Sequence, residues 1–360
     1  MTETKFEQLL RIYALDKLYD YVGYIDMIHN FTQCNKNIHI ICISKSYNHT
    51  PYPLTVIANH SIDRIAKIKH LYLDNENGPN FYFFSQLFPS LESLRLRDDF
   101  DQPINKGMLP RTLRRIEFGL EFNFHQEIVL PESLEELILG DDFNQSMVLP
   151  RSLTKLKYGN QFDNSFHLEH EKSMLPENLS DLELGMYFNE KIPQGFLPQS
   201  LKRLKFGFCF NQQIEKDVLP NGLTDLVFGF HFNQQIPINV LPGSGSLTDL
   251  EFDFNFNQLV KLPANLRNLR FGARYNQPIN RGFLPESLRN LRFGRLFNQK
   301  LVGCLPKKLE ILGLSWYYGF CADDFVSQGF EDLCVHEFND SGKLVKITRI
   351  RDGLIHIVMD

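Results

Sequence analysis

The segment HLEHEK brings together side chains that can bind a metal ion. His167 and His170 lie three residues apart, and Glu169 and Glu171 lie beside them. Imidazole and carboxylate groups are common zinc ligands, but structural zinc sites use four ligands and usually include cysteine, which is missing from this segment. We therefore expect a solvated loop here and predict no metal site.

Adjacent acidic residues could supply the two carboxyl groups that a glycoside hydrolase needs. The pairs are Asp98-Asp99, Asp141-Asp142 and Asp323-Asp324. Two of the pairs follow a short apolar segment, where aspartate favours a turn, and we interpret them as turn residues. We do not interpret Cys34 and His29 as a nucleophile and its base. The sequence also lacks the GxGxxG, GxxxxGK[ST], HExxH and GxSxG motifs. We predict no catalytic residues, no cofactor and no enzymatic activity.

The composition excludes several classes of protein. The chain has 38 basic and 43 acidic residues, a net charge of −5, so binding to nucleic acid is disfavoured. No segment approaches the roughly 18 consecutive apolar residues of a membrane span, and the N-terminus lacks the apolar core of a signal peptide. We therefore expect no membrane contact and an intracellular, cytoplasmic location. One residue type is unusual: the chain contains 32 Phe but only 1 Trp and 13 Tyr.

A repeat determines where the side chains lie. A Leu-Pro pair recurs along the chain, mostly at intervals of 21 or 22 residues. Its prolines are Pro110, Pro131, Pro150, Pro176, Pro198, Pro220, Pro242, Pro263, Pro285 and Pro306. The clearest unit is LPQSLKRLKFGFCFNQQI, from Leu197 to Ile214. Repetition at a fixed period is typical of a solenoid, in which each unit packs on its neighbours.

Each unit predicts one short strand followed by a turn. Leu204 and Phe206 alternate with polar residues, which predicts a strand with one buried face, and Gly207 then allows a tight turn. About eight residues remain before the next Leu-Pro pair, fewer than a helix needs, so we expect extended or single-turn structure there. Strands of successive units should pair into a parallel sheet at about 4.8 Å.

Phenylalanine occupies two columns of this repeat. Phe206 and Phe228 belong to the first column, and Phe210 and Phe232 belong to the second. Because these rings recur at the period of the stacking units, they predict a buried aromatic spine rather than an aromatic ligand cage.

An asparagine follows the second aromatic ring in most units. The column contains Asn123, Asn144, Asn189, Asn211, Asn233, Asn257, Asn276 and Asn298. A turn leaves backbone groups without partners inside the coil, and a carboxamide can both donate to and accept from them. We therefore predict an internal ladder of structural asparagines and not a ligand site.

Two segments resemble a known repeat family. They are Phe100-Asp101-Gln102-Pro103-Ile104 and Tyr275-Asn276-Gln277-Pro278-Ile279, which resemble the FNIP repeat. That family is abundant in social amoebae and in large DNA viruses that infect amoebae, and its repeats are related to leucine-rich repeats. The resemblance covers residues 65–315, and the sequence departs from it between Pro150 and Pro176, where the interval is 26 residues. It implies a solenoid in the cytoplasm, the host cytoplasm if the source is viral.

The first 60 residues lack the repeat and have the apolar spacing of amphipathic helices. Five of them match the spacing of an F-box motif, namely Val22, Asp26, Met27, Cys34 and Lys36. The Leu-Pro opening of an F-box and the aromatic residue after its lysine are missing. Two hypotheses stay open: an F-box-like segment, or a helical cap that shields the first repeat.

Three segments follow from these patterns. They are a helical N-terminal region at 1–60, a repeat solenoid at 61–315, and a C-terminal cap at 316–360 with a β-hairpin around Asp352-Gly353. The resemblance implies an α/β fold that leans to mostly β. We expect a leucine-rich-repeat-like solenoid of about eleven units of about 22 residues, with a parallel sheet on its concave face.

Outward-facing strand positions vary from unit to unit, while the buried columns hardly change. We predict that a protein partner binds the concave face at Arg203, Lys205, Asp225, Asp249, Glu251, Asn268, Arg270, Asn290 and Arg292. Arginines gather near the end of this set, at Arg267, Arg274, Arg281, Arg289 and Arg295. This basic end could meet an acidic patch of the partner, and an ordinary solvated face is the alternative.

Two function classes remain. The first is a protein-interaction solenoid, which the F-box hypothesis would make the substrate receptor of a cullin-RING (SCF-type) ubiquitin ligase, with the ligase adaptor bound at the N-terminus. The second is a structural or decoy repeat scaffold without ligase recruitment. RNA binding at the arginine end is a lesser alternative.

Overall fold

The structure is a computed structural model of the chain. It describes residues 39–42, 52–53, 67–74, 84–96, 98, 100, 104–122, 128–144, 147–162, 175–243, 245–318, 330, 332–339, 341, 343–351 and 354–358. The chain divides into two compact units, Met1–Gly159 (unit 1) and Asn160–Asp360 (unit 2).

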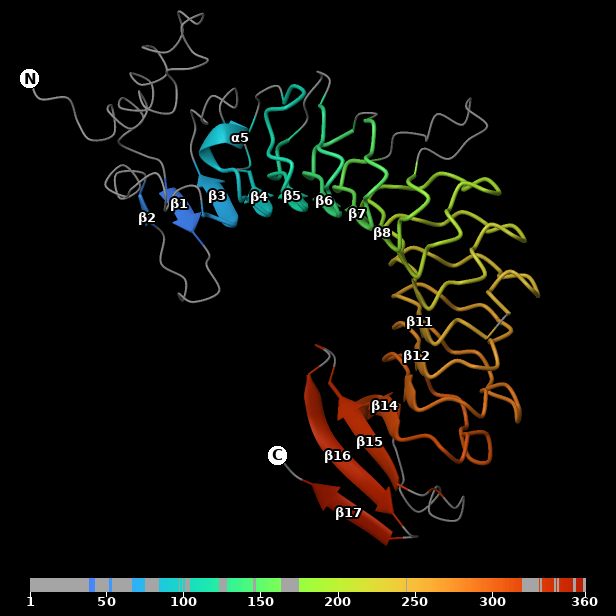
Figure 1. The fold of residues 1–360 in the computed structure, drawn as a ribbon. Helices are drawn as coiled ribbons and strands as arrows, with labels where there is room; N and C mark the ends of the chain where they lie inside the picture. Colours follow the sequence, from blue (N-terminus) through green and yellow to red (C-terminus); the bar gives the residue numbers. More distant parts are fainter. Residues whose placement is uncertain are drawn as a thin grey trace, which may run out of the picture. The chain divides into compact units, whose positions relative to one another are not determined.

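Unit 1 contains a parallel sheet that begins with antiparallel strands (Figure 1). β1 (His39–Cys42) pairs antiparallel with β2 (Tyr52–Pro53) and with β3 (His70–Asp74). The short helix α5 (Phe84–Leu87) follows β3. β3 and the later strands pair in parallel, each with the next, and these are β4 (Ser93–Arg95), β5 (Arg115–Glu117), β6 (Glu136–Ile138) and β7 (Lys155–Lys157).

Unit 2 contains a longer parallel sheet with two antiparallel strands at its end. Its parallel strands are β8 (Asp181–Glu183), β9 (Arg203–Lys205), β10 (Asp225–Val227), β11 (Asp249–Glu251), β12 (Asn268–Arg270), β13 (Asn290–Arg292), β14 (Ile311–Ser315) and β15 (Asp332–Phe338). β16 (Leu344–Arg351) and β17 (Leu354–Val358) add antiparallel strands, with Arg351 paired to Leu354 as the predicted hairpin requires. The predicted turn residues Asp352-Gly353 lie outside the described residues. Because β15 pairs in parallel with β14, the parallel sheet continues past the last Leu-Pro unit.

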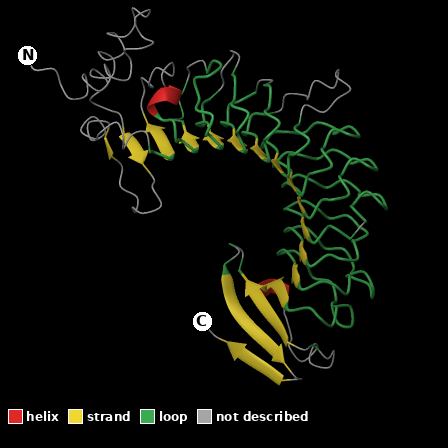
Figure 2. Cartoon of the chain, viewed as in Figure 1, coloured by secondary structure: helices red, strands yellow, loops and turns green. Residues whose placement is uncertain are grey.

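Both units are mostly β, and each is built of parallel solenoid turns of about 22 residues, about ten turns in the chain. Within the described residues the helical elements are α5 and the single-turn 3₁₀ helix η3 (Trp316–Tyr318) (Figure 2). The segments between strands are turns and extended chain, as the length of the unit predicts. Within the predicted helical region at 1–60 the structure describes residues 39–42 and 52–53, and these form the strands β1 and β2 and not helix, so the helical prediction is wrong there. The F-box-like residues Val22, Asp26, Met27, Cys34 and Lys36 lie outside the described residues.

Two tight turns explain the shape of each unit. In the unit that holds β9, the backbone N–H of Leu201 donates to the carbonyl of Pro198 at 3.1 Å, and that of Phe210 donates to the carbonyl of Gly207 at 3.3 Å. Each bond closes a four-residue β-turn, and proline is well suited to begin one because its ring presets the backbone. The Leu-Pro-x-x-Leu and Gly-x-x-Phe patterns therefore mark the two ends of each short strand.

The glycine after the strand has a different role from the predicted one. Gly207 and Gly229 do not have the positive φ that distinguishes glycine turns in this chain. A Cβ at Gly229 would lie 1.8 Å from the carbonyl oxygen of Gly207, and one at Gly207 would lie 1.7 Å from that of Gly185. The glycine is needed because successive turns approach one another too closely for any side chain.

The predicted aromatic spine is confirmed in the core of unit 2. The rings of Phe206 and Phe228 stack with centroids 5.4 Å apart, and Phe252 follows 5.1 Å from Phe228. The second column packs against the first, since Phe232 lies 4.1 Å from Phe228. The middle leucine of each three-residue strand, such as Leu226, is buried beside these rings. Each unit therefore completes its core only by stacking on its neighbours.

No helix within the described residues is both long and apolar enough to cross a membrane.

Candidate protein-binding groove

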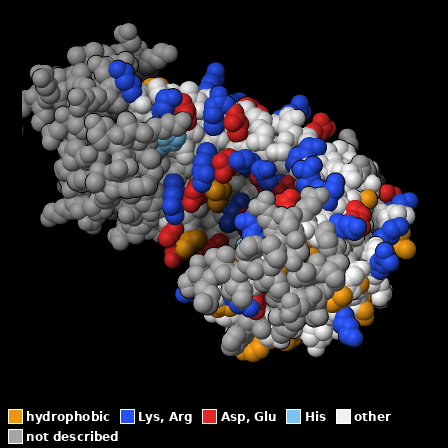
Figure 3. Space-filling view, turned by 90° about the horizontal axis from the view of Figure 1, so that it is seen from below, with side chains coloured by type: hydrophobic (Ala, Val, Ile, Leu, Met, Phe, Trp, Pro, Cys, Tyr) orange, Lys and Arg blue, Asp and Glu red, His pale blue; other side chains and the backbone are white. Residues whose placement is uncertain are grey.

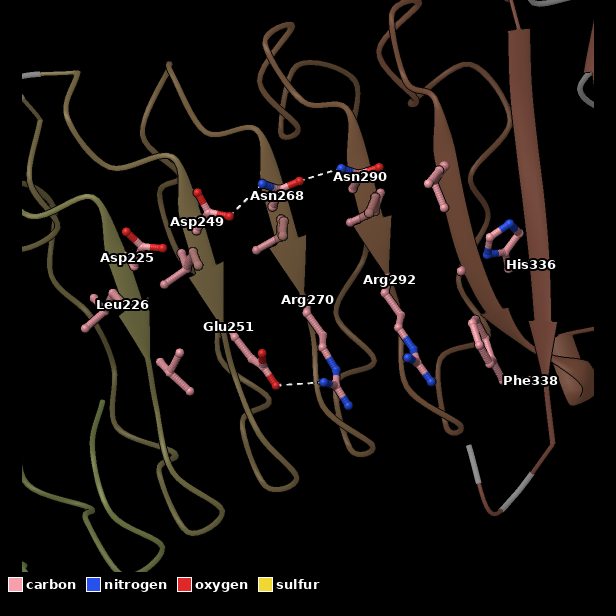
Figure 4. A pocket seen from close by; sticks show the side chains of 16 residues that line it. Asp225, Leu226, Asp249, Glu251, Asn268, Arg270, Asn290, Arg292, His336 and Phe338 are labelled. Atoms are coloured by element: carbon pink, nitrogen blue, oxygen red, sulfur yellow. Dashed lines mark hydrogen bonds and ion pairs between the residues drawn. The ribbon is translucent and has the colours of Figure 1, made fainter. Parts of the chain in front are cut away.

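Side chains of β10 to β15 form a groove of about 460 Å³ on the outward face of the unit 2 sheet (Figure 4). The strand registers arrange them in two rows. Row A is made of Asp225, Asp249, Asn268, Asn290 and Ile311. Row B is made of Val227, Glu251, Arg270, Arg292 and Gly313. The period-two alternation of each strand sends both rows outward while the leucine between them is buried.

Row A is a chain of side-chain hydrogen bonds between neighbouring strands. The Asn268 amide donates to the Asp249 carboxylate at 2.6 Å, and the Asn290 amide donates to the Asn268 oxygen at 2.5 Å. The next member is Ile311, whose side chain has no donor, and Asn290 Oδ1 is a buried acceptor that finds no hydrogen-bond partner among the described residues. The chain of amides thus ends on an unsatisfied oxygen beside an apolar side chain.

Row B carries the charges that face one another across strands. Arg270 forms an ion pair with Glu251 at 2.9 Å. The guanidinium of Arg292 instead lies over the ring of Phe338, 3.8 Å from its centroid. Burial lowers the pKa of Arg292, and the neighbouring charge of Arg270 lowers it further, partly offset by Glu251. Arg292 is therefore a partly desolvated cation held against an aromatic ring.

Gly313 makes the contact between Arg292 and Phe338 possible. A Cβ on Gly313 would lie 2.9 Å from Arg292 Cγ and 3.2 Å from Phe338 Cε2. The side chains of Arg292 and Phe338 therefore meet over Gly313, the position of row B that has no side chain.

The strand β15 forms the wall of the groove. His336 and Phe338 face it, and Cys334 Sγ lies 3.4 Å from His336 Nε2. Burial raises the pKa of the Cys334 thiol, and burial together with Arg292 lowers the pKa of His336. Both shifts favour the neutral thiol and the neutral imidazole, which is the opposite of the thiolate–imidazolium pair of a nucleophilic cysteine.

The groove brings together most of the residues predicted to bind a partner. Those that line it are Asp225, Asp249, Glu251, Asn268, Arg270, Asn290 and Arg292. Arg203 and Lys205 lie outside it on β9, where they form ion pairs with Asp181 and Glu183. Sequence reasoning missed Ile311 and Gly313, which carry no charged or polar side chain in the last Leu-Pro unit. It also missed His336 and Phe338, because the repeat ends before β15. The alternating pattern of DLCVHEF was the available signal for a strand there.

The predicted basic end is less basic in the structure than in the sequence. Arg289 lies 3.4 Å from Glu310, and Arg270 pairs with Glu251. Arg274 lies over the ring of Phe254, 5.6 Å from its centroid. On the face seen in Figure 3, Lys and Arg side chains are interspersed with Asp and Glu side chains. This mixture does not form the continuous basic surface that nucleic-acid binding requires.

The asparagine column forms hydrogen bonds from turn to turn. The Oδ1 of Asn211 accepts from the backbone N–H of Asn233 at 2.9 Å, and the Oδ1 of Asn233 accepts from that of Asn257 at 2.9 Å. The same bond links Asn189 to Asn211, Asn257 to Asn276, and Asn276 to Asn298. The column differs from the prediction in its location: its members are exposed or half-buried rather than internal. The oxygen supplies the acceptor that the outward-facing turn backbone lacks. Asn123 lies outside the described residues.

Asn233→Ala should lower the free energy of unfolding by about 1 kcal/mol, because the Asn257 N–H loses its acceptor. The Gln258 side chain, 3.2 Å from the same oxygen, loses a partner as well. For a protein of this size we expect a fall of about 2–4 °C in the melting temperature, measured by calorimetry. Asn233→Asp is the matched control, since a carboxylate keeps the acceptor. Equal destabilisation by both substitutions would contradict the role of the oxygen.

The residues with metal-binding or catalytic chemistry do not assemble into a site in the part of the chain that the structure describes. No group of three or more His, Cys, Asp and Glu side chains there could hold a metal ion. Asp98 accepts a hydrogen bond from the backbone N–H of Leu120 at 3.1 Å, which is a turn contact. His167, His170 and the pair Asp323-Asp324 lie outside the described residues.

The parallel solenoid and its outward groove define a repeat protein of the leucine-rich-repeat type, a class that typically serves as interaction scaffolds. The model of the FNIP Repeat family matches residues 85–121, 122–161, 169–209, 210–254 and 256–296. The chain therefore belongs to the FNIP repeat family.

Two solved structures are similar to this chain. CroV588, described as a novel circular LRR protein structure, is 41% identical with a TM-score of 0.57, over 66% of this chain and 38% of that one. YopM from Yersinia enterocolitica WA-314 is 22% identical with a TM-score of 0.35, over 63% of this chain and 51% of that one. The alignments thus span about two fifths and about half of those chains. No curated protein matches the sequence.

Proposed function

We propose that this chain is a non-enzymatic protein-interaction solenoid and that the groove of unit 2, on the predicted concave face, binds a protein partner. The observation that carries this proposal is the groove itself. Buried columns of the repeat keep the same residue types, whereas row A changes along the sheet from Asp to Asn to Ile and row B changes from Val to Glu, Arg and Gly. A purely structural or decoy scaffold would need the buried columns but would place no demand on the outward rows.

A site-specific crosslinker tests this proposal. A photoreactive amino acid at Asn268, in the middle of row A, should trap a discrete protein in cells of the native source. The same amino acid at Glu286, an exposed residue that does not line the groove, is the control. Trapping at Asn268 alone supports the proposal. Trapping at both positions, or at neither, favours the scaffold without a specific partner.

We also propose that residues 1–60 join this module to the adaptor of a cullin-RING ubiquitin ligase, which would make the chain a substrate receptor in the cytoplasm. Support comes from the F-box-like spacing of Val22, Asp26, Met27, Cys34 and Lys36. A pull-down of the ligase adaptor by the full chain, and its loss when residues 1–60 are deleted, is the expected result. Failure of the full chain to bind the adaptor would leave the helical cap, and with it the scaffold without ligase recruitment.

A further inference from the structure

Opposite charges without ion-pair partners lie at the two ends of the groove. Within the described residues, Arg292 forms no ion pair, and neither Asp225 nor Asp249 lies within ion-pair distance of a Lys or Arg. Asp225 accepts a hydrogen bond from Thr224 at 2.5 Å, and Asp249 accepts one from Thr248 at 2.6 Å. These hydroxyl groups are neutral, and so is the Asn268 amide that donates to Asp249. Arg203 of β9 interacts with Asp225 at longer range than an ion pair, because its ion pair is with Asp181.

Arg292 is the better defined of the two ends. Glu251 is the nearest acidic residue of row B, but its ion pair is with Arg270, so two cations share one carboxylate (Figure 4). Stacking on Phe338 holds the guanidinium in one orientation and removes part of its water. A cation that is partly desolvated and next to a second cation gains from an anion that enters the groove. Preorganisation by Phe338 also reduces the entropy lost when that anion binds.

A carboxylate of a polypeptide fits this site better than a phosphate group of a nucleic acid. Asp225, Asp249 and Glu251 lie in the same groove and would repel a chain that carries a negative charge at every unit.

The strand spacing sets the distance between the two charges that the groove would recognise. Parallel strands lie about 4.8 Å apart, so β13 is about 10 Å from β11 and about 14 Å from β10. An extended polypeptide advances about 3.3 Å per residue. Arg292 also lies two residues, about 7 Å, further along its strand than the register partner of Asp249 and Asp225. The charges are therefore about 12 Å and about 16 Å apart, and the residues of the segment that face them are four or five positions apart.

We propose that the groove recognises an extended polypeptide segment with an acidic residue four or five positions from a lysine or arginine. The acidic side chain binds at Arg292, the basic side chain binds at Asp225 and Asp249, and the segment crosses strands β10 to β13. This inference rests on the proposed function and specifies the chemistry of the partner.

Selection of a phage-displayed library of random 12-residue peptides on the immobilised full chain tests this proposal. Enriched peptides should carry Asp or Glu four or five positions from Lys or Arg, in either order along the peptide. Synthetic copies of one such peptide should lose about tenfold in affinity when the acid is changed to its amide, and a similar factor when the base is changed to methionine.

Charge reversal in the groove gives the sharper result. Selection on Arg292→Glu should enrich peptides with basic residues at both positions. Arg274→Met is the matched control, because Arg274 also lies over a phenylalanine but does not line the groove. It should select the same peptides as the unaltered chain. Gly313→Ala, which displaces Arg292 from Phe338, should weaken binding of the acid-containing peptide without removing any charge.

Several outcomes would overturn the proposal. They are no enrichment, enrichment without charge pairing, an unchanged preference in Arg292→Glu, and tighter binding of a single-stranded oligonucleotide than of any peptide. Circular dichroism of each variant shows that it is folded. If Asn268 still crosslinks to a protein while the peptides show no charge pairing, this inference fails and the proposed function stands.

Discussion

Replacing Phe228 with alanine should lower the free energy of unfolding by about 3–5 kcal/mol, which is typical of a large ring removed from a close-packed core. The ring is 0% exposed and contacts three others, those of Phe206, Phe252 and Phe232, with centroids between 4.1 and 5.4 Å away. A cavity at this position interrupts the spine between two turns. Because each turn is stable only through its neighbours, the loss weakens the stack on both sides.

Urea unfolding followed by circular dichroism measures this loss. Phe208→Ala is the matched control, because Phe208 is a phenylalanine of the neighbouring turn that is 37% exposed and stacks on Phe230 at 4.4 Å. We expect it to cost about 1 kcal/mol, mainly through the lost stacking. A similar cost for both substitutions would contradict the view that the buried columns hold the turns together.

Gly229→Ala should be destabilising by about 3 kcal/mol, at the upper end of what overpacking costs. A methyl group there would lie 1.8 Å from the carbonyl oxygen of Gly207 and 2.6 Å from its carbonyl carbon. Those atoms belong to the backbone of the previous turn, so they cannot move aside as a flexible side chain can. The turns would have to separate locally, and the hydrogen bond from His231 N–H to the Phe208 carbonyl, now 2.9 Å, would lengthen.

Gly243→Ala is the control for this prediction. A Cβ at Gly243 meets no atom within 4 Å, and its φ is not positive. Alanine there should leave the melting temperature unchanged or raise it, because it restricts the unfolded chain. If Gly229→Ala were equally harmless, close approach of the turns would not be the reason for the glycine column.

The residues of one unit are enough to predict the secondary structure and the buried positions of the repeat. Leu204 and Phe206 predicted a strand with one buried face, and the strand β9 and its core lie there. The Phe206 and Phe210 columns predicted the spine because their period equals that of the stack. These predictions succeeded because burial of one residue per turn is repeated many times, so each unit confirms the others.

The predictions are wrong for residues whose role depends on a contact with the adjacent turn of the solenoid. The sequence predicts that Gly207 is needed for a tight turn of its own backbone. In the structure, the carbonyl of Gly185 lies too close to Gly207 for any side chain. The sequence predicts that Asn233 lies inside the coil, whereas in the structure it is exposed and its Oδ1 accepts a hydrogen bond from the backbone N–H of Asn257. The distance between turns is set by packing of the whole stack, and a one-dimensional pattern carries no measure of it.

The residues alone predict the period, the strands, the aromatic spine and the outward rows that hold Asp249 and Arg270. The groove that these rows form depends on three-dimensional packing, because β15 comes from a segment outside the repeat and pairs with β14. That pairing places Phe338 under Arg292, with Gly313 between them. Periodicity reports whether a residue faces the core or the solvent, since that depends on the unit alone. Contact between non-repeating segments depends on which strand occupies the end of the sheet, and three-dimensional packing alone settles that.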